Sequence, residues 1–278
     1  MMETNRLKGA LEIVVRTDPG LVRAKNEDSV FADASHGLAI LADGMGGYNA
    51  GEVASRMATT LLSSRLEAAF ATTAAHETDR LTGQPFASRC LAEQIEAVNA
   101  AIYHAAEDDA KFVGMGTTLV AAVFCDDRVV VAHVGDSRLY RLRGEEFMAI
   151  THDHSFLQEQ IDQGLMSAEE ARYSLNRNLV TRAVGVDDKV EPEIHVYSVR
   201  AGDVYLLCSD GLYDMVDEAE IQQALETFGA NLELSATQLI QMANDHGGDD
   251  NISVVVVKVL REFPVAGGGL SKLWSWLN

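Results

Sequence analysis

One stretch joins an apolar run to a carboxylate and a glycine-rich turn: Leu38-Ala39-Ile40-Leu41-Ala42-Asp43-Gly44-Met45-Gly46-Gly47. The apolar run predicts a β-strand that ends where Asp43 begins the turn. From Asn49 the spacing becomes helical, with Asn49 as a candidate N-cap, Glu52 three residues later and an apolar face to about residue 70. The chain therefore passes from a strand, through an acidic turn, into a long helix.

Strands and helices are grouped along the rest of the chain rather than alternating. The further expected helices cover about 85–106, 217–226 and 235–245. The further expected strands cover 11–16, 29–32, 119–124, 129–134, 139–142, 147–150, 194–199, 204–208 and 252–259. We expect the four strands between 119 and 150 to form one antiparallel meander, and 252–259 to be buried on both faces. This grouping favours an α+β layered domain.

Composition limits the function classes. The chain has 278 residues, 47% of them apolar, so a globular domain with a hydrophobic core is expected. The 22 Lys and Arg against 42 Asp and Glu give a net charge of −20, which argues against nucleic acid as a partner. The three cysteines are widely spaced, and neither a signal peptide nor a membrane-spanning run is visible. We expect a cytoplasmic protein without a transmembrane segment.

Aspartates recur at the ends of the expected strands. Asp43, Asp136, Asp210 and Asp250 each stand at such an end beside a turn residue, and the pair Glu27-Asp28 precedes another strand. Any one of these positions could simply be turn chemistry. If the carboxylates converge, however, their mutual repulsion requires a cation. Hard oxygen ligands favour Mg²⁺ or Mn²⁺.

Other metal and phosphate sites find less support in the sequence. The eight histidines lie in no HExxH arrangement and the cysteines in no CxxC arrangement, so a zinc site is not indicated. No GxxxxGK[ST] motif occurs, and the 44–47 turn lacks the lysine of a nucleotide-phosphate loop. Nucleotide binding is therefore not expected.

Six motifs together carry a resemblance to a known family. In chain order they are Arg23-Ala24-Lys25-Asn26-Glu27-Asp28, Asp43-Gly44-Met45-Gly46-Gly47, Gly116-Thr117-Thr118, Gly135-Asp136-Ser137-Arg138, Ser209-Asp210-Gly211 and Asp250-Asn251. Over about residues 11–260 the series resembles the bacterial branch of the PP2C (PPM) metal-dependent Ser/Thr protein phosphatases. The resemblance implies a β-sandwich of two antiparallel sheets flanked by helix pairs, with two or three Mn²⁺ or Mg²⁺ ions at one end.

The resemblance also implies roles for the acidic residues. Asp43 would bridge two metal ions, and Gly44 would offer its backbone carbonyl to one of them. Asp210 and Asp250 would complete the shell of the first ion. Asp28 would lie on the side of the second ion.

Three further roles follow from the same resemblance. Glu27 would act on the second ion through water, and Asp136, together with Asp210, would bind a third, weaker ion. Arg23 would hold the substrate phosphate, for which a planar guanidinium is well suited. Thr117 and Thr118 are expected to start a strand and shape the cleft rather than to bind metal.

The implied reaction is hydrolysis of phosphoserine and phosphothreonine in proteins by a hydroxide that bridges two metal ions. Many eukaryotic members of the family carry a histidine, assigned as general acid, where Met45 stands here. Met45 cannot donate a proton, so a metal-bound water is the first candidate for that task. Tyr48 and His154 are possible assisting residues, although packing or capping is an equally good interpretation of either.

The sequence divides into one domain and a tail. We expect a phosphatase domain over 8–262, with a surface flap at about 155–180 whose Arg172, Arg177 and Arg182 either contact phosphorylated segments or lie on solvated helix faces. A glycine-linked amphipathic tail follows at 263–278. The apolar face of 270–277 could dock on a partner, on a membrane surface or back on its own domain.

The expected partners are phosphorylated proteins and a cognate Ser/Thr kinase, and the protein is expected to be a monomer. Two alternatives stay open: a catalytically inactive module that binds phosphoproteins, and a SpoIIE-type phosphatase of a partner switch. Because every acidic ligand position of the family is filled, the sequence favours an active phosphatase.

Overall fold

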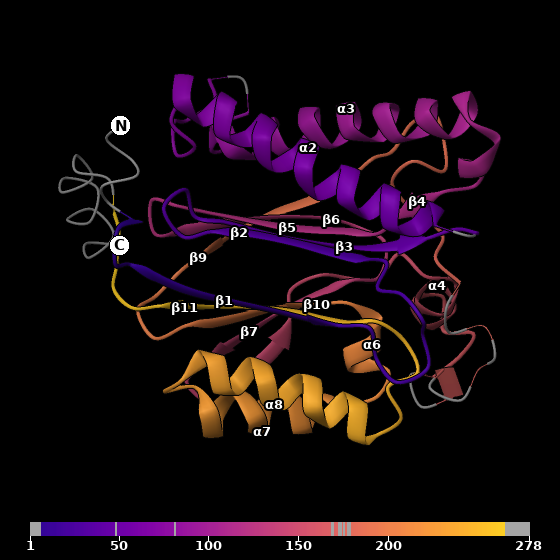
Figure 1. Cartoon of the computed structure of the whole chain (residues 1–278). Helices are drawn as coiled ribbons and strands as arrows, with labels where there is room; N and C mark the ends of the chain where they lie inside the picture. Colours follow the sequence, from indigo (N-terminus) through magenta and orange to yellow (C-terminus); the bar gives the residue numbers. More distant parts are fainter. Residues whose placement is uncertain are drawn as a thin grey trace.

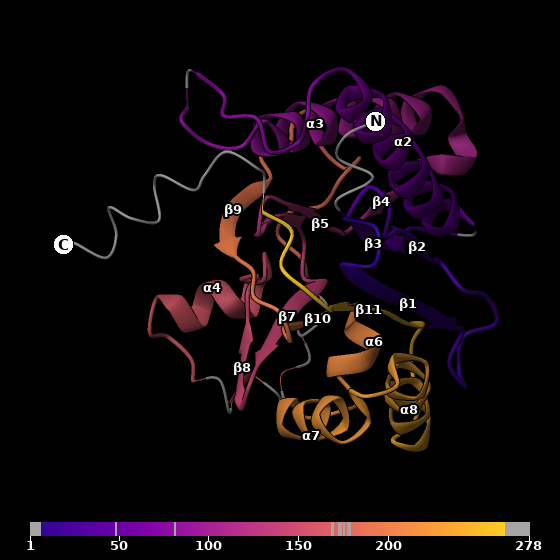
Figure 2. The ribbon, with the colours of Figure 1, turned by 90° about the vertical axis from the view of Figure 1, so that its left-hand side faces the viewer.

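A computed structural model describes residues 7–47, 49–80, 82–167, 170–171, 174, 176 and 179–264. It arranges the chain in four layers, with helices α2 and α3 on one sheet and helices α7 and α8 on the other (Figure 1). Figure 2 shows the same layers in a second view. The helices are α2 Ala50–Thr72, α3 Phe86–Asp108, η1 Ala110–Phe112, α4 Phe156–Asp162, α6 Asp210–Tyr213, α7 Glu218–Phe228 and α8 Leu232–Asp245.

The strands form two antiparallel sheets. They are β1 Leu11–Asp18, β2 Asp28–Asp33, β3 Leu38–Met45, β4 Gly116–Thr117, β5 Leu119–Cys125, β6 Arg128–Val134, β7 Arg138–Arg143, β8 Glu146–Ala149, β9 Glu193–Ser198, β10 Val204–Cys208 and β11 Ile252–Val259. The first sheet has the order β1-β11-β10-β7-β8. The second has the order β2-β3-β5-β6-β9, and β4 pairs with the end of β3. The expected α+β sandwich of two antiparallel sheets with flanking helix pairs is confirmed.

The continuous apolar run of β3 follows from its position in the middle of these layers. Leu38, Ile40 and Ala42 pack in the core beneath α2 and α3, whereas Ala39 and Leu41 pack in the core between the sheets. Successive side chains of a strand point to opposite faces, so a strand covered on both faces needs apolar residues at every position. Strand β11 is buried on both faces in the same way, as the sequence predicts.

The prediction of a single meander over residues 119–150 is wrong. Strand β6 pairs with β5 and β9 in one sheet, whereas β7 pairs with β8 and β10 in the other. The chain crosses between the sheets at Gly135-Asp136-Ser137, where Gly135 has a φ of +99°. A turn inside a sheet and a crossing between sheets share the same local residues, so the sequence pattern alone did not distinguish them.

One smaller expectation also differs from the structure. Asn49 precedes α2, but its side chain makes no capping hydrogen bond and instead accepts one from the Lys25 ammonium group.

In the expected flap at 155–180, the described residues include the short helix α4. Its N-cap Ser155 pairs with Val180 in an isolated bridge, so the two ends of the segment lie together.

The end of the domain packs on its beginning. Phe263 is 3% exposed in the core between the sheets, and its amide donates to the Asp127 carboxylate. The expected tail helix at 270–278, Arg172 and Arg177 lie outside the described residues. Among the residues that are described, no helix is both long enough and apolar enough to span a membrane.

Candidate metal centre

Pairing of strands β2 and β3 brings the first two carboxylates together. Asp28 lies directly opposite Asp43 in the antiparallel register. The Asp43 carbonyl accepts hydrogen bonds from the Thr117 hydroxyl at 2.8 Å and the Thr118 amide at 2.8 Å, and its amide donates to the Thr118 hydroxyl at 3.1 Å. The two threonines therefore hold the backbone of Asp43 from both sides.

The neighbouring strands β10 and β11 of the other sheet bring in two more carboxylates. Ser209 separates β10 from Asp210, which opens α6, and Asn251 separates Asp250 from β11. Between them, the Ser209 hydroxyl donates to Asp28 Oδ2 at 2.8 Å, so one side chain links the two sheets at the centre. This link was missed at the sequence level, because Ser209 reads there only as part of a turn.

The carboxylates interact strongly. The pKa of Asp43 is raised well above its ordinary value, first by loss of hydration and then by the charges of Asp28, Asp210, Asp136 and Asp250. Loss of hydration and neighbouring carboxylates also raise the pKa of Asp210 well above the ordinary value. The expected convergence of these aspartates is thus present in the folded chain.

Two oxygen atoms of the cluster are left without partners. Asp28 Oδ1 and Asp210 Oδ1 are buried and receive no hydrogen bond in the part of the chain that is described. Loss of hydration raises the pKa of Asp28 to about 7. Buried, unpaired carboxylate oxygens are unfavourable unless a cation binds them, so the donor set fits hard divalent ions such as Mg²⁺ or Mn²⁺.

Gly44 lies where the start of α2 crosses the end of β3. Its amide donates to the Glu27 carbonyl at 3.2 Å, and a Cβ atom at Gly44 would lie 2.1 Å from the Gly51 carbonyl oxygen. The pKa of Glu27 is raised by loss of hydration, while Arg23 lowers it and Asp250 raises it. Only glycine fits this crossing, which places Glu27 and Gly44 beside the aspartates.

Arg23 lies at the rim of the cluster. Its guanidinium donates to Asp250 Oδ2 at 2.6 Å, and its side chain is 52% exposed. Asn251 holds the loop that carries Arg23: its side-chain amide donates to the carbonyls of Lys25 and Pro19, and its side-chain oxygen accepts from the Glu27 amide. Asn251 appears in the sequence motif, but its role as the anchor of this loop is visible only in the fold.

Asp136 lies at the crossing between the sheets and is 6% exposed. Loss of hydration raises its pKa to about 7. The Tyr213 hydroxyl donates to its carbonyl at 3.0 Å, and Ser137 next to it hydrogen-bonds Thr118 at 2.7 Å. These contacts hold the chain at Asp136 and at the residue that follows it.

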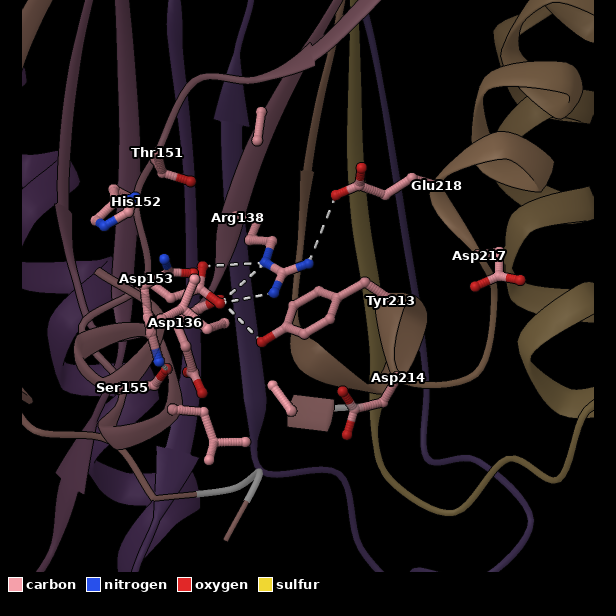
Figure 3. Close-up of a pocket in the computed structure, with 15 residues that line it drawn as sticks. Asp136, Arg138, Thr151, His152, Asp153, Ser155, Tyr213, Asp214, Asp217 and Glu218 are labelled. Atoms are coloured by element: carbon pink, nitrogen blue, oxygen red, sulfur yellow. Dashed lines mark hydrogen bonds and ion pairs between the residues drawn. The ribbon is translucent and has the colours of Figure 1, made fainter. Parts of the chain in front are cut away.

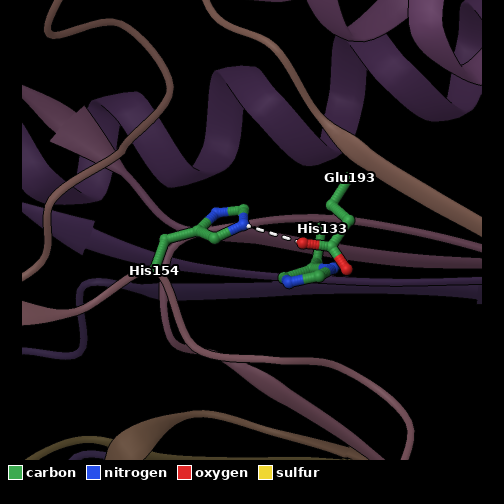
Figure 4. Close-up of side chains that lie close together, drawn as sticks. All are labelled: His133, His154 and Glu193. Carbon is green, nitrogen blue, oxygen red and sulfur yellow. Dashed lines mark hydrogen bonds and ion pairs between the residues drawn. The ribbon is translucent and has the colours of Figure 1, made fainter. Parts of the chain in front are cut away.

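His154 is bound to the same crossing. Its amide donates to the Gly135 carbonyl at 3.0 Å, and its Nδ1 accepts from the Gly135 amide at 3.2 Å. Its ring stacks on His133, and its Nε2 faces Glu193 at 3.4 Å (Figure 4). Burial, with the charges of His133 and Arg182, lowers the pKa of His154 to about 4, so the ring is neutral near pH 7.

The His133, His154 and Glu193 side chains lie close enough together to suggest a second metal site. The contacts argue against one. Both ring nitrogens of His154 are engaged, and the Arg182 guanidinium lies 3.4 Å from Nε2, where it would repel a cation. The trio therefore supports the turn at Gly135. Tyr48, the other possible assisting residue, lies outside the described residues.

This fold and this acidic centre define a class of protein with many solved members. One of them is the catalytic domain of the Ser/Thr protein phosphatase PstP in complex with two manganese ions. It superimposes with a TM-score of 0.78 at 40% identity and covers 90% of this chain and 98% of that one. The sequence profile described as Protein phosphatase 2C matches residues 22–245, and the chain belongs to this family.

Two curated relatives give the extent of the similarity. The Ser/Thr protein phosphatase PstP of Mycobacterium tuberculosis is 40% identical over 271 residues, which are 96% of this chain and 49% of PstP. The chain thus spans about half the length of that relative. The Ser/Thr phosphatase stp of Listeria innocua is 41% identical over 246 residues, which are 87% of this chain and 94% of stp.

Proposed function

We propose that this protein is a metal-dependent phosphatase that hydrolyses phosphoserine and phosphothreonine in proteins. The observation that carries the proposal is the convergence of Asp28, Asp43, Asp210 and Asp250, with two unpaired buried oxygens, beside the exposed Arg23. The names of the relatives, Ser/Thr phosphatases from several bacteria, support this substrate class.

We assign the metal ligands to the residues that meet at this centre. Asp43 would be shared by two ions, Asp210 and Asp250 would bind one of them, and Asp28 with Glu27 would bind the other. We assign Asp136 and Asp210 to a third ion, since their charges interact. Bound Mn²⁺ or Mg²⁺ would supply an activated water and neutralise the charge of the phosphate. The Gly44 carbonyl is the remaining ligand expected from the family pattern.

The other residues orient the substrate and the ligands. Arg23 binds the phosphate, and the hydrogen bond from Arg23 to Asp250 holds the guanidinium beside the centre. Asn251 holds the loop of Arg23, Ser209 fixes one oxygen of Asp28, and the two threonines fix the backbone of Asp43. Met45 has no proton to donate, so the leaving group takes its proton from water. His154, bound to Gly135 through two hydrogen bonds, serves as a positioning residue for Asp136.

The biological setting we propose is a monomeric cytoplasmic enzyme that opposes a Ser/Thr kinase of the same cell. The relatives are bacterial Ser/Thr phosphatases, which supports a cycle of phosphorylation and dephosphorylation.

Release of phosphate from a phosphothreonine peptide in the presence of Mn²⁺ tests the proposal. Asp43→Asn removes the shared ligand and should lower kcat/KM at least about 100-fold. Asp33→Asn, at the other end of the same hairpin of β2 and β3, is the matched control and should stay within about twofold.

Manganese binding, followed by calorimetry, separates the remaining interpretations. A wild-type protein that binds Mn²⁺ and the phosphopeptide but releases no phosphate would be an inactive binding module. A protein active only on a phosphorylated partner-switch regulator, and not on peptides, would be of the SpoIIE type. Full activity of Asp43→Asn would refute the assignment of the centre.

A further inference from the structure

Strand pairing brings together the two aspartates that we assign to the third ion. Arg138, the first residue of β7, lies directly opposite Cys208, the last residue of β10. Asp136 precedes Arg138 by two residues and Asp210 follows Cys208 by two, so antiparallel pairing directs both aspartates to the same end of the sheet. Both lie beyond the paired residues, and the sheet alone therefore does not fix the distance between their carboxylates.

The short helix α6 connects the two aspartates. It begins with Asp210 and ends with Tyr213, whose hydroxyl donates to the Asp136 carbonyl at 3.0 Å. Leu212, within the same helix, is fully buried in the core under α7 and α8. One anchored helix thus carries Asp210 and binds the backbone of Asp136.

Arg138 holds the Tyr213 ring. Its guanidinium carbon lies 3.7 Å from the centroid of that ring (Figure 3). Its Nε and Nη2 atoms donate to the Asp153 carboxylate at 3.0 Å and 2.7 Å, and its Nη1 atom donates to the Tyr140 hydroxyl at 3.0 Å. A planar guanidinium can stack on a ring and form this fork of hydrogen bonds at the same time, which an ammonium group cannot do.

The surroundings of Arg138 differ from those of Arg23. The Arg138 side chain is 24% exposed, and its charge is paired with the Asp153 carboxylate. The Arg23 side chain is 52% exposed at the rim of the centre. Arg138 is therefore part of the wall of the centre, whereas Arg23 is accessible to a phosphate group.

We propose that Tyr213 and Arg138 are positioning residues that fix the separation of Asp136 and Asp210 and thereby set the affinity for the third ion. This inference rests on the ligand assignment made for the proposed function. Mg²⁺ binds oxygen ligands at about 2.0–2.1 Å in a nearly fixed geometry, so a small displacement of one carboxylate weakens binding. Arg138 acts through the Tyr213 ring, and Tyr213 acts through the backbone of Asp136.

Calorimetric titration of the metal-free full-length chain with Mn²⁺ tests the proposal. Tyr213→Phe removes the hydroxyl and keeps the ring on Arg138. We expect it to raise the Kd of the weakest of three Mn²⁺ sites about three- to tenfold, which is the effect of one lost hydrogen bond, and to leave the other two within about twofold. Asp136→Asn, titrated in parallel, should lose the weakest site and so identifies it.

Two further variants complete the comparison. Arg138→Lys keeps the charge but loses the fork and the stacking, so it should raise the same Kd. Tyr197→Phe is the matched control, because it also removes a tyrosine hydroxyl that donates to a backbone carbonyl, that of Ile150 at 3.5 Å. It should keep all three Kd values within about twofold. A merely structural role of Tyr213 would lower the stability of the protein but leave the three affinities of the folded protein unchanged.

The outcomes are distinct. An unchanged weakest site in Tyr213→Phe, an equal loss at all three sites, or a wild-type protein that binds only two Mn²⁺ ions overturns the positioning role. If thermal melting shows that Arg138→Lys does not fold, Tyr213→Phe decides the question. A wild-type protein that releases no phosphate from a phosphothreonine peptide would instead overturn the proposed function, while the Mn²⁺ titrations would still test the two positioning residues.

Discussion

At the scale of single residues, the centre depends on groups that hold ligands as much as on the ligands. Thr117 and Thr118 bind the backbone of Asp43 on both sides and so help to hold its carboxylate in place. Arg23 is placed by a loop that Asn251 anchors through three hydrogen bonds. The sequence motifs contain these residues, but a motif does not tell which of its members contact substrate and which support the others.

Gly44 gives a prediction at this scale. Gly44→Ala would bring a Cβ atom to 2.1 Å from the Gly51 carbonyl, so α2 must shift away from the centre. We expect a loss of about 1–3 kcal/mol in unfolding free energy, measured by urea denaturation, together with weaker Mn²⁺ binding.

Gly47→Ala is the control in the same turn, because nothing lies within 4 Å of its added Cβ atom. It should unfold within about 0.5 kcal/mol of the wild type. Equal stability and equal Mn²⁺ affinity for Gly44→Ala would show that the close crossing is unimportant.

At the scale of elements, the strands were predictable and their distribution between the two sheets was not. The all-apolar runs of β3 and β11 identify strands covered on both faces, and the structure confirms this. The crossing at Gly135–Ser137 was missed, because the local signals of a hairpin turn and a crossing are alike. The same holds for Asn49. Its sequence position suits a cap, but its side chain accepts a hydrogen bond from Lys25, which is distant in sequence.

Strand β11 carries a prediction about its two faces. Val255 packs between the sheets and Val256 packs under α7 and α8, and both are fully buried. Val255→Thr and Val256→Thr each bury a hydroxyl in an apolar core, so each should lower the unfolding free energy by about 1–3 kcal/mol in urea denaturation.

Val113→Thr makes the same chemical change at a residue that is 69% exposed. Its effect should be within about 0.5 kcal/mol. If one of the two β11 variants were as stable as this control, the strand would have one solvated face and the layer arrangement would be incorrect.

At the scale of the whole molecule, the acidic surplus divides into two parts. The carboxylates of the centre have raised pKa values and need divalent ions, whereas the remaining acidic residues lie elsewhere on the molecule. The sequence predicted the residues that converge. It did not predict that α4, α6 and the crossing line a cavity of about 460 Å³ beside Asp136 (Figure 3), because these segments are distant in sequence.

The raised pKa values predict how stability without metal depends on pH. The pKa values of Asp28 and Asp136 rise from 3.8 to about 7, and those of Asp43 and Asp210 are also raised well above 3.8. At pH values between the ordinary pKa and the raised one, the folded state therefore binds more protons than the unfolded state. Stability falls as pH rises through these values. His133 and His154 have lowered pKa values and act in the opposite direction, mainly below about pH 6.5, where most of the unfolded histidines are charged.

From pH 6.5 to 8 the carboxylates therefore dominate, because the two histidines together oppose them by less than about 1 kcal/mol. In EDTA, the unfolding free energy should fall by about 2–5 kcal/mol across this window. Asp136→Asn should give a shallower decline, whereas Asp188→Asn, at an exposed position, should keep the wild-type slope. Added Mn²⁺ should stabilise the protein more at pH 8 than at pH 6.5, because metal binding requires the deprotonated ligands. A metal-free stability that is flat or rises with pH across this window would mean that the carboxylates do not converge as described, and the centre would lose its electrostatic basis.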